Sequence, residues 1–169
     1  MDWNFEEDEI SEIADSVILE DIKDTWDELF DMYEELFDCP IEIDVLGLQN
    51  IGVKFELSNK FDNYMSLGEV AVTKDGKPLR IVFNKVIYGF KSKYFYSTII
   101  HEMCHLSATL SDLSKNNFNP EIYEKCNGHT QSWQDRVDRF NNIKNSKGEN
   151  VFMIVPYLTK ELSIKDMLE

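Results

Sequence analysis

Three stretches of the chain carry apolar residues at helical spacing. The first stripe is ended by Pro40, and its members are Leu19, Ile22, Trp26, Leu29, Phe30, Tyr33, Leu36 and Phe37. The second stripe consists of Ile99, Met103, Leu106 and Leu110, and the third of Trp133, Val137, Phe140 and Ile143. Because one face of a helix returns every three or four residues, these stripes predict three amphipathic helices.

Between the first two predicted helices, apolar and polar residues alternate, which is typical of half-buried strands. Residues 41–45 and 51–57 alternate in this way, and residues 65–73 and 79–84 flank an Asp75–Gly76 pair that predicts a hairpin turn. Residues 151–158 predict a short closing strand, and the last residues are expected to be helical or frayed. The order of elements indicates an α+β fold: a small twisted sheet packed on the second helix, with an additional N-terminal helix.

Composition limits the kind of protein. A chain of 169 residues, 43% of them hydrophobic, can bury a core without covalent cross-links. Its cysteines, Cys39, Cys104 and Cys126, form no C-x-x-C pair, which argues against a disulfide scaffold or a second zinc site. The N-terminus lacks the pattern of a signal peptide, and the longest apolar run is too short to span a membrane. We therefore expect a soluble, cytoplasmic protein.

The negative charge is concentrated at the N-terminus. Residues 1–38 hold 16 of the 32 acidic residues beside one lysine, Lys23, and so account for the whole net charge of −15. We expect residues 1–40 to form an acidic arm and an amphipathic helix, in one compact unit with a domain at 41–169. The acidic face is either a solvated surface, or a surface that repels or mimics nucleic acid, or one that docks a basic protein.

The second helical stripe contains the pattern H-E-x-x-H at His101, Glu102 and His105. At about 100° per residue, the two histidines project within roughly 40° of each other, one turn apart, and can hold one zinc ion. Glu102 lies about 100° round the helix, where it reaches a water beside the metal rather than the metal itself. The apolar stripe falls on the opposite face, so one side packs on a core and the other carries the chemistry.

A hydrolytic zinc site needs a third protein ligand and an open position. The chain has three histidines, and the third, His129, precedes the third predicted helix, which makes it the leading candidate. Glu121 or Glu124 is an alternative, because some zinc peptidases take a downstream glutamate. Cys104 could serve as a soft ligand, although a small buried thiol is the simpler interpretation.

The segments HEMCHLSA and GHTQSW resemble the SprT-like metallopeptidases, whose pattern is H-E-x-x-H followed by H-G-x-x-W or H-G-x-x-F. The resemblance covers about residues 65 to 143. It implies a zincin-like domain in which His101, His105 and His129 bind one zinc ion and Glu102 is the catalytic acid/base. Trp133 takes the place of the family's aromatic residue. The chain departs from the family at Thr130, where the family has glycine.

The expected function is that of a zinc endopeptidase acting on protein substrates. An extended substrate would pair with the strand at 68–72 or with the strand at 81–83, and Tyr123 is a candidate oxyanion donor. The aromatic residues that are interleaved with lysines at 84–97 are expected to fill the core rather than to stack on single-stranded nucleic acid. Because residues 39–169 are charge-neutral, we expect direct DNA binding to be weak or absent. The alternative is a non-catalytic protein that zinc braces and whose acidic N-terminal face engages a basic partner.

Overall fold

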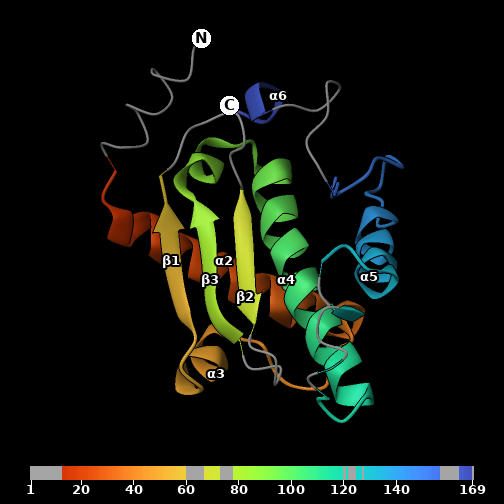
Figure 1. Ribbon diagram of the computed structural model, residues 1–169. Coiled ribbons are helices and arrows are strands. Elements are labelled where there is room, and N and C mark those ends of the chain that lie inside the picture. Colours follow the sequence, from red (N-terminus) through yellow and green to blue (C-terminus); the bar gives the residue numbers. More distant parts are fainter. Residues whose placement is uncertain are drawn as a thin grey trace.

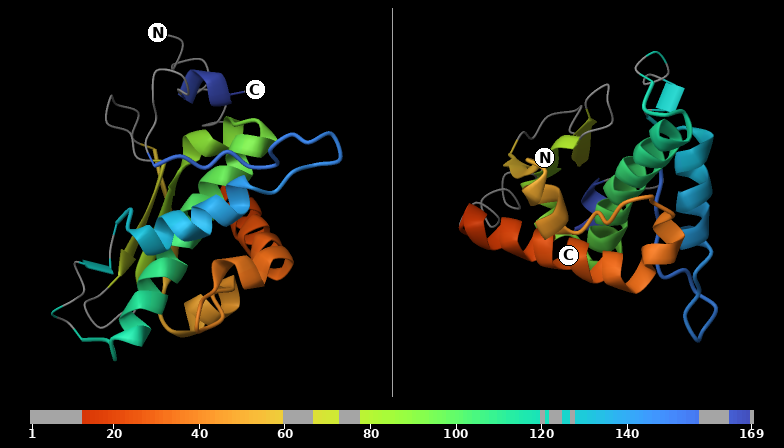
Figure 2. Two further views of the ribbon diagram at one scale, coloured as in Figure 1. Left: turned by 90° about the vertical axis from the view of Figure 1, so that its right-hand side faces the viewer. Right: turned by 90° about the horizontal axis from the view of Figure 1, so that it is seen from below.

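The computed structural model describes residues 13–59, 67–72, 78–119, 121, 125–126, 128–156 and 164–168. These residues form an α+β fold, in which helices pack on one face of a three-stranded mixed sheet (Figures 1 and 2). The predicted fold class is confirmed. The predicted acidic arm at 1–12 and the predicted turn at Asp75–Gly76 lie outside the described residues.

The strands lie in the order β1 (Lys54–Ser58), β3 (Pro78–Asn84), β2 (Gly68–Val72). β1 runs parallel to the central strand β3, and β2 runs antiparallel to it. Along β3, Ile81 and Phe83 are fully buried whereas Arg80 is exposed, as expected when one face of a sheet is covered. Because β2 pairs only with β3 within the described part of the chain, it is an edge strand there.

The first predicted helix is confirmed as α2 (Asp15–Phe37), which crosses behind the sheet (Figure 1). Trp26 of α2 is fully buried, and its ring centroid lies 5.4 Å from that of Phe55 in β1 and 6.3 Å from that of Phe83 in β3. The indole Nε1 donates a hydrogen bond of 2.7 Å to the carbonyl of Ile43. The apolar body and the polar atom of this side chain are thus both satisfied, which fixes α2 on the sheet.

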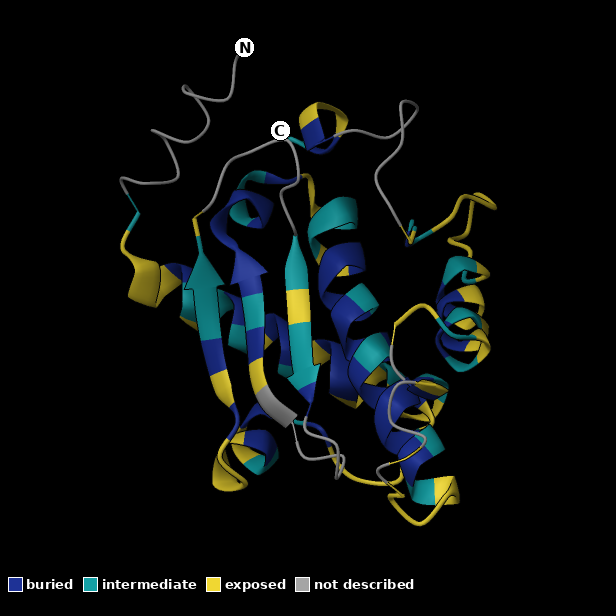
Figure 3. Ribbon diagram, viewed as in Figure 1, coloured by how far each residue is buried: buried dark blue, intermediate teal, exposed yellow. Residues whose placement is uncertain are grey.

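The second predicted helix is α4 (Ser92–Lys115), which runs alongside β2 (Figure 1). Its predicted apolar stripe is buried, with Ile99, Met103, Leu106 and Leu110 each at most 3% exposed. Figure 3 shows buried residues concentrated along β3 and α4. The core therefore lies between the sheet and the helices α2 and α4.

The third predicted helix is α5 (Gln131–Asn141), which packs on α4. It begins at Thr130, whose side-chain oxygen accepts a hydrogen bond of 3.2 Å from the backbone nitrogen of Trp133. Phe140 near its end is fully buried, with its ring centroid 4.8 Å from that of Phe37. The N-cap at Thr130 places His129 directly before the helix.

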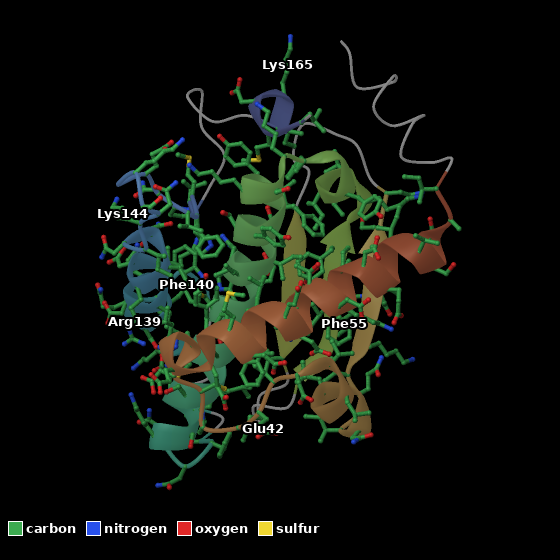
Figure 4. All side chains as sticks on the ribbon, turned by 180° about the vertical axis from the view of Figure 1, so that it is seen from behind. Glu42, Phe55, Arg139, Phe140, Lys144 and Lys165 are labelled. Carbon is green, nitrogen blue, oxygen red and sulfur yellow. The ribbon has the colours of Figure 1, made fainter. Side chains whose placement is uncertain are left out.

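The C-terminus of α2 is capped by side chains of α5. Arg136 is 3% exposed, and it donates hydrogen bonds from Nε to the carbonyl of Phe37 at 2.6 Å and from Nη2 to the carbonyl of Asp38 at 2.7 Å. Arg139 donates from Nη1 to the carbonyl of Leu36 at 3.2 Å, and Figure 4 shows it beside the end of α2. Because the last carbonyls of a helix have no partner within it, these bonds tie α2 to α5.

Three short helical segments complete the described structure: α3 (Val45–Asn50), the 3₁₀ helix η1 (Lys85–Gly89) and α6 (Ile164–Met167). Residues 84–97, which are rich in lysine and aromatic side chains, form η1 and the start of α4. Phe90 is buried, Tyr88, Tyr94 and Phe95 pack on the core, and Tyr96 is exposed. Most of these aromatic side chains fill the core, as predicted.

The predicted strand at 41–45 is wrong, and the one predicted at 151–158 is wrong over its described residues, 151–156. Residues 41–45 lead into α3 instead, because Asp44 caps this helix through the backbone nitrogen of Gly47 and Asp27 accepts a hydrogen bond from the nitrogen of Val45. Residues 151–155 form no strand, because side chains take the place of a neighbouring strand. The amide group of Asn141 bonds both the nitrogen and the carbonyl of Ile154.

No helix of the described residues is both long and apolar enough to cross a membrane. The boundary that the sequence analysis places between residues 1–40 and 41–169 stays a prediction, although α2 contacts β1, α4 and α5.

Candidate metal centre

The H-E-x-x-H histidines lie on the side of α4 that faces α5, opposite the buried apolar stripe. His101 and His105 are one turn apart, and their Nε2 atoms are 3.1 Å from each other. Both side chains are half-buried, whereas the helix face opposite them is packed into the core. The predicted burial of the apolar side of α4 is confirmed, whereas the chemical role of the opposite side stays a prediction.

His129 joins these two histidines from the turn before α5. One ring nitrogen from each of His101, His105 and His129 lies within 4.8 Å of the others. The ring centroid of His129 is 5.4 Å from that of His101 and 4.8 Å from that of His105. The structure thus brings together the three histidines that the sequence singles out, two from α4 and one from the turn before α5.

Trp133 supports all three imidazoles from one side. Its ring centroid lies 5.0 Å from His101, 5.2 Å from His105 and 4.3 Å from His129. Its Nε1 donates a hydrogen bond of 3.3 Å to the backbone carbonyl of His101. Because Trp133 belongs to the first turn of α5, it couples the position of α5 to that of the two histidines on α4.

Two backbone carbonyls orient the α4 histidines. The ring of His101 donates a hydrogen bond to the carbonyl of Val155, and the ring of His105 donates one to the carbonyl of Gly128. Histidines that bind metals generally use their second ring nitrogen in this way, which selects the tautomer and holds the ring in place. Both carbonyls come from segments outside α4, the first from residues 151–155 and the second from the turn that carries His129.

The imidazoles are neutral at physiological pH. Burial, followed by the charge of His129, lowers the pKa of His101 to about 4. Burial and the charges of the other two histidines lower the pKa of His105 to about 3. Burial also lowers the pKa of His129. Metal ions bind the neutral form of histidine, so this cluster needs no deprotonation near pH 7 before it can bind one.

Glu102 lies beside the cluster and is 5% exposed. Its Oε1 is 3.8 Å from Nε2 of His101. Burial, with a smaller contribution from the charge of Glu69, raises the pKa of Glu102 to about 8. A carboxyl group whose pKa has moved close to neutrality can both take up and release protons near pH 7.

The alternative ligands behave differently. Cys104 is fully buried, burial raises the pKa of its thiol, and it is not part of the cluster. Glu121 is exposed and also not part of the cluster. Glu124 and the candidate oxyanion donor Tyr123 lie outside the described residues. The roles of the site residues as ligands and as catalyst stay predictions, although their proximity is a feature of the structure.

The cluster fits a zinc ion by its chemistry and its dimensions. Zinc accepts imidazole nitrogen at about 2.0–2.1 Å in a tetrahedral arrangement, which places ligand nitrogens about 3.3 Å apart. The Nε2 atoms of His101 and His105 are 3.1 Å apart, and one ring nitrogen from each of the three histidines lies within 4.8 Å of the others. Three neutral nitrogen donors and an exposed side chain at His129 leave room for a further ligand from solvent.

Several residues around the cluster carry no signal in the sequence. The carbonyls of Gly128 and Val155 belong to backbone that any residue could supply. Gly68 of β2 lies so close to Glu102 that a Cβ at this position would be 2.8 Å from Cγ of Glu102. Arg136 looks like a polar residue on the outer face of an amphipathic helix, but it is buried. Of the residues around the cluster, Trp133 alone could be identified from the sequence, because it follows His129 by four residues.

A protein-family model described as the SprT-like family matches residues 27–152. The match begins inside α2 and includes the sheet, α4, the three histidines and α5. No curated protein and no solved structure matches the chain.

Proposed function

The chain belongs to the SprT-like family, and we propose that it is a zinc-dependent endopeptidase that hydrolyses peptide bonds of protein substrates. The observation that carries this proposal is the convergence of His101, His105 and His129, all neutral near pH 7, beside the buried carboxyl group of Glu102. A purely structural zinc site has four protein ligands and does not need a buried acid beside it.

One zinc ion per chain would be held by one nitrogen of each of His101, His105 and His129. When bound, zinc lowers the pKa of a water to about 7 and polarises the carbonyl of the scissile bond. The rings of His101 and His105 hold their orientation through the carbonyls of Val155 and Gly128. This arrangement keeps the ligand nitrogens directed toward one point before the ion arrives, which lowers the cost of ordering them.

Glu102 is the proposed acid/base residue. It takes the proton of the attacking water and delivers it to the departing amine. Its Oε1 lies 3.8 Å from Nε2 of His101, so one water molecule beside the histidines is within its reach. The raised pKa of Glu102 falls when a dication lies next to it, so the carboxylate is ready to accept a proton in the loaded site.

The sheet favours one of the two strands considered for substrate binding. β3 is central and paired on both sides, whereas β2 is an edge strand that lies beside α4. An extended peptide can add to such an edge through backbone hydrogen bonds, whatever its sequence. We therefore propose that the substrate pairs with β2, at Gly68–Val72, and passes in front of the histidines.

The variant Glu102→Gln tests this function. It keeps the shape of the side chain and removes the acid/base group, so we expect a folded protein that binds one zinc ion and cleaves at least 100-fold more slowly than the wild type. Cleavage of a protein substrate, with zinc quantified in both samples, provides the measurement. A variant that keeps wild-type cleavage would contradict the peptidase proposal.

A second candidate is a non-catalytic protein whose acidic face binds a basic partner, with zinc bracing the fold. One observation favours it: exposed acids follow one another along α2 at spacings of three or four residues, at Glu20, Asp24, Glu28, Asp31 and Glu35. Such a row of like charges raises the negative potential on one side of the molecule. The Glu102→Gln variant separates the two candidates, because a binding protein would lose none of its function.

A further inference from the structure

The first residue of the edge strand lies against the carboxyl group of Glu102. Gly68 of β2 is paired with Phe83 of β3, whose side chain is fully buried on the helix-covered face. Residues opposite each other on neighbouring strands point to the same face of the sheet. A side chain at position 68 would therefore point toward the helices, and α4 is the helix that lies beside β2 (Figure 1).

There is no space for that side chain. An ideal Cβ on Gly68 would lie 2.8 Å from Cγ, 3.0 Å from Cδ and 3.0 Å from Oε1 of Glu102. These are the three nearest atoms outside the neighbouring residues, and all of them belong to Glu102. A Cβ essentially never lies as close as 2.8 Å to another heavy atom in a folded protein, so either the side chain of Glu102 or the strand would have to shift.

The backbone conformation does not require a glycine here. The glycines with positive φ in the described residues are Gly52, Gly128 and Gly148, and Gly68 is not one of them. An alanine could adopt the conformation of this strand residue, and glycine within a strand weakens it. The missing side chain therefore serves the packing of Glu102.

Displacement of Glu102 would be felt at the histidines. Its carboxyl oxygen Oε1, one of the atoms that the Cβ would meet, is also the atom 3.8 Å from Nε2 of His101. The side chain is 5% exposed, so it has little free space into which it can turn. A misplacement of about 1 Å in a catalytic group can slow a reaction on the order of 100-fold.

We infer that Gly68 is a positioning residue for Glu102: the absence of its side chain lets the edge strand pack on the carboxyl group and hold it toward the histidines. The catalytic part of this inference rests on the proposed peptidase function, whereas the contact does not. The backbone of β2, the strand proposed to bind substrate, thus packs directly against Glu102, the residue proposed to move the proton.

The variant Gly68→Ala tests the inference through zinc content and kinetics. We expect wild-type zinc content, because the atoms nearest to the new Cβ belong to Glu102 and not to a histidine. We expect kcat to fall about 10- to 100-fold, with a smaller change in KM. Wild-type kcat in Gly68→Ala would overturn the inference.

A matched control comes from β1, a strand that has no part in the proposed site. Lys54 is exposed and pairs with the exposed Arg80, so it points away from the helix-covered face of the sheet. Lys54→Gly weakens the sheet by loss of strand propensity, but it leaves Glu102 and β2 in place, so kcat should stay near the wild-type value. An equal loss of kcat in this variant would overturn the inference, because general weakening of the sheet would then be sufficient.

A thermal-unfolding cycle gives a readout that needs no activity. In the metal-free protein, Gly68→Ala should lower Tm when Glu102 is present, and should leave Tm unchanged or raise it in a Glu102→Ala background. The same loss of Tm in both backgrounds would contradict the inferred contact between Gly68 and Glu102. If the wild-type protein cleaves no substrate, the proposed function fails, and this cycle still decides whether Gly68 and Glu102 are coupled.

Discussion

His129 is the residue on which the ligand count depends, because it is exposed and comes from a turn rather than from α4. We predict that His129→Ala lowers zinc affinity at least 100-fold, because two imidazoles remain where zinc needs three protein ligands. Competition with a chelator of known affinity provides the measurement. Unchanged tight binding of one zinc per chain would transfer the third-ligand role to Glu121, Glu124 or Cys104.

The metal-free cluster predicts how stability depends on pH. The pKa of His101 falls to about 4 and that of His105 to about 3, so below pH 6.5 the unfolded chain binds more protons at these residues and the fold loses stability. Glu102 acts in the opposite direction. Its pKa rises to about 8, so the folded chain binds more protons between about pH 4.5 and 8, and stability falls as the pH rises through that range.

From these groups together, we predict that the free energy of unfolding of the metal-free protein is greatest near pH 6.5. Below that value the two histidines outweigh Glu102, and above it Glu102 acts alone. Thermal unfolding from pH 5 to 8.5 in the presence of a chelator measures this profile. Glu102→Gln should abolish the loss between pH 6.5 and 8. Retention of that loss in the variant would assign it to another group.

At the scale of residues, the sequence predicts those parts of the site that carry a side-chain signature. His101, Glu102 and His105 have a fixed spacing on one helix, and His129 is the only other histidine. The partners of these side chains could not be predicted in the same way. The carbonyls of Gly128 and Val155 and the empty space at Gly68 depend on where the backbone passes, and residue identity does not encode that.

At the scale of elements, α5 joins the metal centre to the N-terminal helix. Trp133 of α5 lies against the three imidazoles, and one turn further on Arg136 caps the C-terminus of α2. A displacement of α2 would therefore reach the histidines through α5. The structure gives α2 a part in shaping the site, in addition to covering the sheet.

We predict that Arg136→Ala lowers the free energy of unfolding by about 2–4 kcal/mol, because it removes charged hydrogen bonds and leaves the carbonyl of the buried Phe37 unpaired. Zinc affinity should fall as well, because α5 then loses part of its attachment to α2. Arg139→Ala is the matched control. Its side chain is exposed, donates one hydrogen bond of 3.2 Å and forms an ion pair of 3.9 Å with Asp38, so the cost should be at most about 1 kcal/mol. Urea unfolding measures the free energy of unfolding of both variants. Equal losses in the two variants would show that the hydrogen bonds from Arg136 to the end of α2 have no special importance.

Long sequence patterns predict the elements more accurately than short ones. The three long helical stripes are confirmed, and a stripe of four or more apolar positions at helical spacing seldom arises by chance. Residues 41–45 alternate and residues 151–155 are all apolar, but neither segment forms a strand. Such short patterns indicate only that some of the side chains can be buried. They do not show whether the backbone bonds to a strand or to side chains such as those of Asp27 and Asn141.

At the scale of the whole molecule, the acidic face of α2 predicts a salt-dependent partner. If it docks a basic protein, changing Glu20, Asp24 and Glu28 to Gln, Asn and Gln should slow association, and added salt should slow the wild type in the same way. The same charge change at Glu42, Asp135 and Glu149, exposed acids from elsewhere on the chain, is the control. Association kinetics on a surface sensor measure both, and equal effects would show that no specific face is involved.

The charge distribution also predicts weak binding to DNA. Non-specific affinity requires several lysines or arginines that neutralise phosphates together, and here the net charge is −15. We predict that duplex DNA binds with a Kd above about 1 μM at physiological salt, which a gel shift can measure. Submicromolar binding under these conditions would mean that a basic surface exists that the net charge conceals.

We propose that one zinc ion, held by three histidines, makes this chain a peptidase. Titration of the metal-free protein with zinc tests this, with cleavage of an unfolded, lysine-rich polypeptide followed by mass spectrometry. We predict no cleavage without metal, and internal cleavage that rises until one zinc is bound per chain and then stays constant. A fully loaded protein that leaves the polypeptide intact, or cleavage that persists in the metal-free protein, would contradict this proposal.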